Sequence, residues 1–304
     1  MSREKHAFSA ISKCYPISVL PKPFFDTQIV AMAADGRIAA SEWILVQRYF
    51  QDKADYHISP LTVGEILDRI ASDVPGKYFQ AAQRQVKMLY PHGKRKSFFD
   101  FAPYFVMQAV FGVKISRSRL LENDFGFTLE VILWAQSKRD LDVGVALPFL
   151  KTDRIRINLE KFTYEHRSIQ NGYLGYMSRF KGKKKFPFPL DQWIGNALSL
   201  YGMDTEENRE KLSNALNSTY ECERWLHDSA RNPNYNVGRR NISDQIDLQQ
   251  LSYLADPAVV FVTNDSDFRT RLTNSLQAER IKTFTELLDV IRTGQSLLPA
   301  DGSL

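Results

Sequence analysis

The segment from Ser243 to Phe268 constrains the fold more than any other part of the chain, because it contains a short apolar run followed directly by acidic residues. Apolar residues recur about one helical turn apart between Ile246 and Leu254, which predicts a helix with Ser243 as a suitable N-cap. Asp256-Pro257 closes this helix, since a residue before proline is driven out of the α region. Ala258 to Val262 is continuously apolar and β-branched, the pattern of a strand buried on both faces. We therefore expect an α/β fold.

Four aspartates flank the predicted strand. Asp244 and Asp247 lie at the start of the helix before it, and Asp265 and Asp267 follow it in T-N-D-S-D-F. In an open α/β sheet, ligands bind outside the carboxyl ends of the strands. Each aspartate taken alone is better explained as a helix cap or a loop acid. The helix–acid–strand–acid pattern as a whole predicts a site.

This pattern resembles the C-terminal half of a PIN-domain nuclease, in which an aspartate on a helix precedes an apolar strand and a T-x-D…D-F ending. Asp247 lies ahead of V-T-N-D at the separation usual in that family, and Asp265 matches the acid after the strand. PIN domains open with a strand that ends in an acid, and here Phe24-Phe25 leads into Asp26-Thr27-Gln28. Gln28 departs from the family, which commonly has asparagine there. Taken alone, Asp26 would more often be a turn residue.

A second acid follows in I-S-P-L-T-V-G-E-I-L, residues 58–67, which resembles the PIN element that carries an acid early on a helix. A short strand is expected over Asp55 to Ile58, just before it. The resemblance makes Glu65 the second acid. The alternative is structural, because Thr62 with Glu65 three residues later has the form of a capping box.

The resemblance implies a three-layer α/β/α sandwich with a mostly parallel central sheet. Residues 1–75 and 231–304 are expected to be the two halves of one PIN-like domain, the second ending in a strand near Ile281 and a helix over Thr285 to Arg292. Residues 76–230 are expected to be a large, mainly helical insertion. Helical spacing recurs there over Tyr78–Tyr90, Phe98–Phe111, Leu120–Gln136, Leu190–Tyr201 and Glu206–Leu226.

Composition narrows the class of protein. The net charge of +5 and the pI near 9.0 are compatible with a nucleic-acid partner without demanding one. Cys14 and Cys222 are the two cysteines, so neither a disulfide scaffold nor a zinc site is indicated. No apolar run reaches the length of a membrane helix, and the N-terminus has no apolar signal core. We expect a cytoplasmic protein with no membrane partner.

Several basic side chains are candidates for holding a phosphate backbone. One cluster lies in a loop that contains glycine and proline, and the other candidates lie just before and after the acidic segment. They are Arg179, Lys181, Lys183, Lys184, Lys185, Arg239, Arg240 and Arg269. The alternative is a solvated charged face, the commonest role of a charge run.

Carboxylates gathered in one crevice raise each other's pKa unless a cation neutralises them. Mg²⁺ or Mn²⁺ suits an all-carboxylate site, where it could activate a water against a phosphodiester. The predicted catalytic and metal-binding residues are Asp26, Glu65, Asp247 and Asp265, and Asp267 and Asp244 are further candidate ligands.

The resemblance implies hydrolysis of RNA, in the manner of a bacterial toxin or defence effector. Nothing in the sequence separates RNA from DNA, so a DNA or structure-specific nuclease stays an alternative. A PIN-like module that binds nucleic acid or protein without cutting is another, and an unrelated α/β protein is a third. By analogy, the insertion could hold a partner or an inhibitor. The possible protein partners are an inhibitor, an activator or a second copy of the chain.

Overall fold

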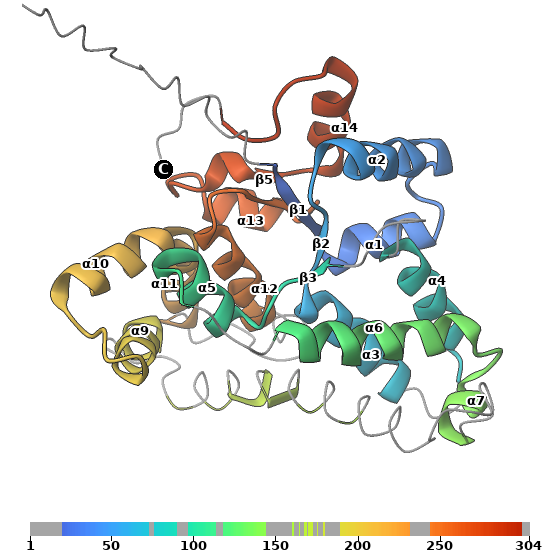
Figure 1. Cartoon of the computed structure of the whole chain (residues 1–304), viewed down its shortest axis with the longest axis horizontal. Helices are drawn as coiled ribbons and strands as arrows, with labels where there is room; N and C mark the ends of the chain where they lie inside the picture. Colours follow the sequence, from blue (N-terminus) through green and yellow to red (C-terminus); the bar gives the residue numbers. More distant parts are fainter. Residues whose placement is uncertain are drawn as a thin grey trace, which may run out of the picture.

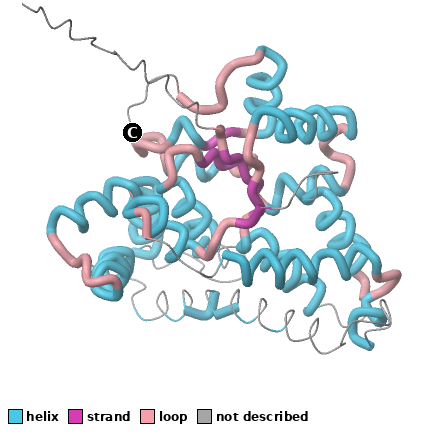
Figure 2. The backbone as a smooth tube through the Cα atoms, viewed as in Figure 1, coloured by secondary structure: helices cyan, strands magenta, loops and turns pink. Residues whose placement is uncertain are grey.

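The computed structural model describes residues 20–72, 76–89, 97–113, 118–143, 189–231 and 244–299, together with single positions between 160 and 179. Helices make up 70% of the described residues. The short strands lie in the middle of the molecule with helices around them (Figure 2). The chain is therefore a mixed α/β protein in which the strands are few and buried.

The strands that carry the predicted acids form a small parallel sheet. β1 (Lys22–Phe25) pairs with β4 (Val259–Val262), and β4 pairs with β5 (Ile281–Lys282). β2 (His57–Ile58) and β3 (Ser97–Phe98) form a separate parallel pair.

The β2–β3 pair lies beside β1, where the Asp55 amide donates to the Pro21 carbonyl at 2.8 Å. The strands of the described residues consequently follow the order β3-β2-β1-β4-β5, in which β2 lies beside β1 without forming a ladder with it. The order changes direction between β1 and β4.

Two hydrophobic cores form because alternate residues of a strand point to opposite faces of the sheet. Phe25 and Val262 lie in the core we call the α1-side core, and Phe24 and Phe261 lie in the α12-side core. The Phe24 ring stacks on the Phe261 ring with their centroids 4.7 Å apart. Each face of the sheet is thus covered by helices.

The helices divide between these cores. The α1-side core includes residues of α1 (Thr27–Ala34), α2 (Ala40–Lys53), α3 (Pro60–Ser72), α4 (Phe79–Leu89), α6 (Ser118–Trp134), α7 (Lys138–Val143) and α14 (Phe284–Thr293). The α12-side core includes residues of α5 (Ala102–Phe111), α9 (Pro189–Leu200), α10 (Glu206–Ala215), α11 (Asn217–Arg231), α12 (Asp244–Leu251), η1 (Ser252–Ala255) and α13 (Ser266–Arg271). Figure 1 shows α9, α10 and α11 on one side of the strands, with α5 beside α11. Helices α4, α6 and α7 lie on the other side.

The expected strand over Ala258 to Val262 is confirmed, as are strands at Ile58 and Ile281 and the final helix. A mixed α/β fold with parallel strands is also confirmed, whereas the three-layer sandwich and the division at residues 75 and 230 stay predictions. The helix predicted from Phe98 begins later than expected: Phe98 lies in β3, and α5 begins at Ala102. Pro103 is suited to the first turn of a helix and therefore favours the later start.

Among the described residues, no helix combines the length and the apolar character needed to cross a membrane.

A buried arginine joins the segment before β4 to the segment before β5. Arg280 belongs to η2 (Ala278–Arg280), is 5% exposed, and donates to the carbonyls of Leu254, Asp256 and Val259 at 2.6, 2.7 and 3.2 Å. Burial lowers the pKa of its guanidinium to about 10, so it stays charged at neutral pH. One side chain thereby satisfies carbonyls at the end of η1 and the start of β4.

We expect Arg280→Met to lower the free energy of unfolding by about 3 kcal/mol, because the substitution keeps an apolar stem and leaves buried carbonyls without their donor. Urea denaturation would measure it. Arg292→Met is the control: Arg292 pairs with Glu42 at 3.1 Å on the exposed surface, so its loss should change stability by less than about 1 kcal/mol. Equal effects of the two substitutions would contradict the role assigned to Arg280.

Candidate functional site

Two of the predicted acids lie at the carboxyl ends of the neighbouring strands β1 and β4. Asp26 directly follows β1, and Asp265 lies three positions after the last residue of β4. Thr263, which is fully buried, joins them: its Oγ1 donates to Asp26 Oδ2 at 2.8 Å and accepts from the Asp265 amide at 3.1 Å. The parallel pairing of β1 with β4 is what places these groups together.

Asp26 also begins the first helix. Its Oδ1 accepts from the Gln28 amide at 3.4 Å as the N-cap of α1, and its own amide donates to the Val262 carbonyl at 3.0 Å. Its side chain is buried, and this burial raises the pKa of the carboxyl group. The bonds from Thr263 and Gln28 act in the opposite direction, and the charge of Asp265 raises the pKa further.

Glu65 reaches the same place from α3. Thr27, the first residue of α1, donates its hydroxyl to Glu65 Oε2. Burial is the largest influence on Glu65 and raises its pKa to about 7. The Thr27 bond lowers this pKa, whereas the charge of Asp26 raises it.

The capping-box alternative for Glu65 is wrong. The Leu61 amide donates to Ser59 Oγ at 3.2 Å, so Ser59 serves the start of α3. Thr62 donates its hydroxyl to the Phe25 carbonyl at 3.0 Å instead, which ties α3 to the end of β1. Glu65 is thus free of a capping role and faces the start of α1.

The structure therefore brings Asp26 within electrostatic range of both Asp265 and Glu65. Asp247 is half-buried on α12, which packs against α11, and it is not among the charges that act most strongly on Asp26 and Glu65. Asp244 is the first residue of α12 and Asp267 the second of α13, while their side chains lie outside the described part of the chain.

The acids suit a hard divalent cation by type but are not gathered into a ready-made site. Like charges that raise each other's pKa are the setting in which such a cation is favoured, and carboxylate oxygens are its preferred ligands. Within the described ranges, however, no group of three or more His, Cys, Asp or Glu side chains could hold a metal ion as it stands. Binding would require these carboxylates to move closer together.

The predicted basic residues are placed only in part. Arg269 lies on α13, one turn after Asp265, and pairs with Glu286 at 2.9 Å. Arg179 is exposed and helical, so the predicted loop does not include it. The remaining candidates, Lys181, Lys183, Lys184, Lys185, Arg239 and Arg240, lie outside the described residues.

Sequence reasoning missed the two threonines that hold the acids. Thr27 and Thr263 each donate a hydroxyl to a carboxylate, and each lies next to or near an acid in the chain. Asn264 was also missed: its Oδ1 accepts from the Phe284 amide at 3.0 Å and fixes the start of α14. A threonine next to or near an acid at the end of a strand is the sequence pattern that could have predicted these two residues.

Comparisons with protein-family models, with curated proteins and with solved structures found no match for this chain.

The raised pKa of Glu65 predicts how stability depends on pH. An unfolded glutamate loses its proton near pH 4.5, whereas folded Glu65 keeps it to about pH 7, so the folded state binds more protons between these values. The free energy of unfolding should therefore fall as pH rises from 4.5 to 7. We expect Glu65→Gln to remove roughly 2 kcal/mol of this fall, measured by urea denaturation in EDTA.

The matched control is Glu279→Gln, since Glu279 is exposed. It should leave the pH profile of the wild type unchanged. A wild-type curve that falls no more steeply than that of Glu65→Gln would contradict the raised pKa of Glu65.

Proposed function

We propose that this protein is a PIN-like, divalent-metal-dependent nuclease that hydrolyses phosphodiester bonds in RNA. The observation that carries the proposal is the joining of Asp26 and Asp265 through Thr263 at the carboxyl ends of β1 and β4. The strand order changes direction between these two strands. In open α/β sheets, this is the position at which ligands bind.

In this proposal, the residues of the chain have two roles, which are to bind the metal ion and to orient its ligands. Asp26, Glu65, Asp265 and Asp247 would hold Mg²⁺ or Mn²⁺, with Asp244 and Asp267 as further ligands. Such an ion, when bound, lowers the pKa of a water and neutralises charge on the phosphate. Thr27 and Thr263 orient the carboxylates of Glu65 and Asp26 through their hydroxyl groups.

Arg269 would contact a phosphate in this proposal, because it lies one helical turn after Asp265. Its partner Glu286 also caps the start of α14, where Glu286 Oε2 accepts from the Thr283 amide at 2.7 Å. If Arg269 bound a phosphate instead, Glu286 would lose this ion pair but would keep its capping bond at the start of α14. The basic segments around residues 181–185 and 239–240 would extend the phosphate contacts.

The two covered faces of the sheet support the α/β/α arrangement that the PIN resemblance implies. Alternate residues of β1 and β4 enter separate cores, and each core has its own helices. We accordingly propose a three-layer sandwich with the segment 76–230 as its elaboration. The toxin or defence role rests on the resemblance, as does the choice of RNA over DNA.

A second candidate function is a PIN-like module that binds nucleic acid or protein without cutting it. It is favoured by the state of Asp26, whose two carboxylate oxygens are both engaged by protein donors. The lack of a ready-made metal group among the described side chains points the same way. An unrelated α/β protein stays the third alternative: the nearness of Asp26 to Asp265 and to Glu65 weighs against it, and the position of Asp247 does not.

The test is cleavage of end-labelled single-stranded RNA and of DNA of the same sequence, each with Mn²⁺, Mg²⁺ or EDTA. We expect cleavage of RNA with either metal and none with EDTA. Asp26→Asn and Asp265→Asn should each reduce it about 100-fold or more, since each removes a charge that supports the reaction. Asp35→Asn is the control, because Asp35 is an exposed carboxylate just after α1 that pairs with Arg37 at 3.5 Å.

Further outcomes separate the alternatives. Cleavage of DNA in preference to RNA would identify the substrate class as DNA. Saturable binding of RNA without cleavage, and without stabilisation by Mn²⁺ in a thermal melt, would favour the non-cutting module. A loss of cleavage in Asp247→Asn comparable to that in Asp265→Asn would place α12 in the site.

A further inference from the structure

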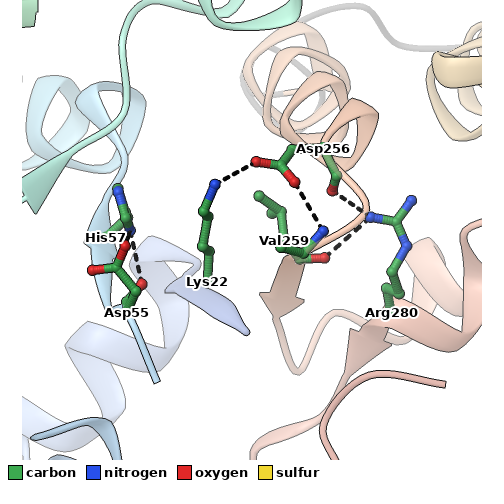
Figure 3. A network of polar contacts seen from close by, with 7 residues as sticks. Lys22, Asp55, His57, Asp256, Val259 and Arg280 are labelled. Atoms are coloured by element: carbon green, nitrogen blue, oxygen red, sulfur yellow. Dashed lines mark hydrogen bonds and ion pairs between the residues drawn. The ribbon is translucent and has the colours of Figure 1, made fainter. Parts of the chain in front are cut away.

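Arg271, the last residue of α13, lies against an aromatic ring. The carbon of its guanidinium group is 3.5 Å from the centre of the Trp225 ring on α11, which packs against α13. Because this is the contact distance of two stacked planar groups, the guanidinium lies on the face of the ring. Two cations at the amino end of the strands bind oxygen atoms instead: Lys22 pairs with Asp256, and Arg280 donates to backbone carbonyls (Figure 3).

The Trp225–Arg271 pair is anchored in the core and still reaches the surface. Trp225 packs against the α12-side core, which fixes the position of its ring. Both members of the pair are half-buried, and their neighbours in the chain, Arg224 and Thr270, are exposed. The core therefore supports the ring, and the ring in turn supports the guanidinium.

The pair lies beside the acidic end of the sheet. α13 begins directly after Asp265, and Arg271 is six positions after it, roughly 9 Å further along the helix. Arg269 and Arg271 are two positions apart and leave the helix on opposite flanks. Arg269 consequently pairs with Glu286 of α14, whereas Arg271 contacts Trp225 of α11. A strand bound at the acids would reach Arg271 within about three nucleotides, at about 3.4 Å for each nucleotide.

An arginine held in this way is suited to a nucleobase. The guanidinium group is planar and more weakly hydrated than an ammonium group, so flat aromatic rings stack on it. Unpaired bases of nucleic acids are held by stacking on aromatic side chains and on guanidinium planes. Stacking uses the face of the group, so it is compatible with hydrogen bonds that the N–H groups make at the edge. Trp225 covers one face, and a base would lie on the opposite one.

We propose that the Trp225–Arg271 pair binds one nucleobase of a single-stranded nucleic acid, with the base stacked on the guanidinium of Arg271 and with Trp225 as a positioning residue. The inference rests on the proposed nucleic-acid substrate, to which it adds a contact with a base. It depends neither on cleavage nor on a metal ion. Every base has a face that can stack, so the site tolerates different sequences.

The test compares two labelled octanucleotides, an ordinary RNA and one with the same backbone that lacks every base. Fluorescence anisotropy at low salt, in EDTA to prevent metal-dependent cleavage, measures the affinity for each. Arg271→Lys keeps the charge and removes the plane, so it should weaken binding of the ordinary RNA about tenfold. Binding of the abasic strand should change less than about twofold, because it depends on phosphate contacts alone. Trp225→Leu, which keeps an apolar side chain against the core, should have the same selective effect.

The matched control is Arg224→Lys, the same substitution at the position before Trp225, where Arg224 is exposed and pairs with Glu221 at 3.1 Å. It should leave both affinities unchanged. An Arg271→Lys variant that binds RNA as tightly as the wild type, or that loses affinity for both strands equally, would overturn the stacking site. If the wild type still cleaves RNA in that case, the proposed nuclease is retained. A wild type that neither binds nor cleaves RNA would overturn both proposals.

Discussion

The pairing of β1 with β4 is the interaction on which the rest of this structure depends. Four residues on each side, from Lys22 opposite Val259 to Phe25 opposite Val262, join segments from the two ends of the described chain. The pairing divides the apolar side chains between two cores and brings Asp26 beside Thr263 and Asp265. Without it, the helices would have no common surface and the acids no reason to meet.

The two ends of the β1–β4 pair differ in whether their charged groups have partners of opposite charge. At the amino end, Lys22 faces Asp256, and Arg280 satisfies backbone carbonyls, so buried charges have partners of suitable kind. At the carboxyl end, burial raises the pKa values of Asp26 and Glu65, and neighbouring carboxylates raise them further. Such an arrangement weakens the fold unless something binds there, which is why the carboxyl end is the better candidate for function.

Local patterns in the sequence were sufficient for the strand before Thr263 and for the acids at two strand ends, since burial and proline act over a few residues. They could not decide the role of Glu65, because Thr62 and Glu65 have capping-box spacing whether or not the box forms. The bond from Thr62 to Phe25 decides it, and that bond joins residues 37 positions apart. Phe98 similarly fits a helical period but pairs with Ile58 in a strand. A cavity at the amino end of β1 is lined by residues of several segments, among them Lys22, His57 and Asp256, so no local pattern in the sequence reveals it.

The separation of the two strands in the chain has a consequence for synthesis. Asp26 and Thr263 are 237 positions apart, so the hydroxyl that holds Asp26 is made long after the carboxylate it binds. Until β4 leaves the ribosome, the two phenylalanines of β1 have no strand to pair with, and contacts of such long range form slowly. A chain interrupted before Asp265 contains Asp26 and Glu65 but lacks the acid that follows β4. The order of the segments thus delays the formation of the candidate site until most of the protein has been made.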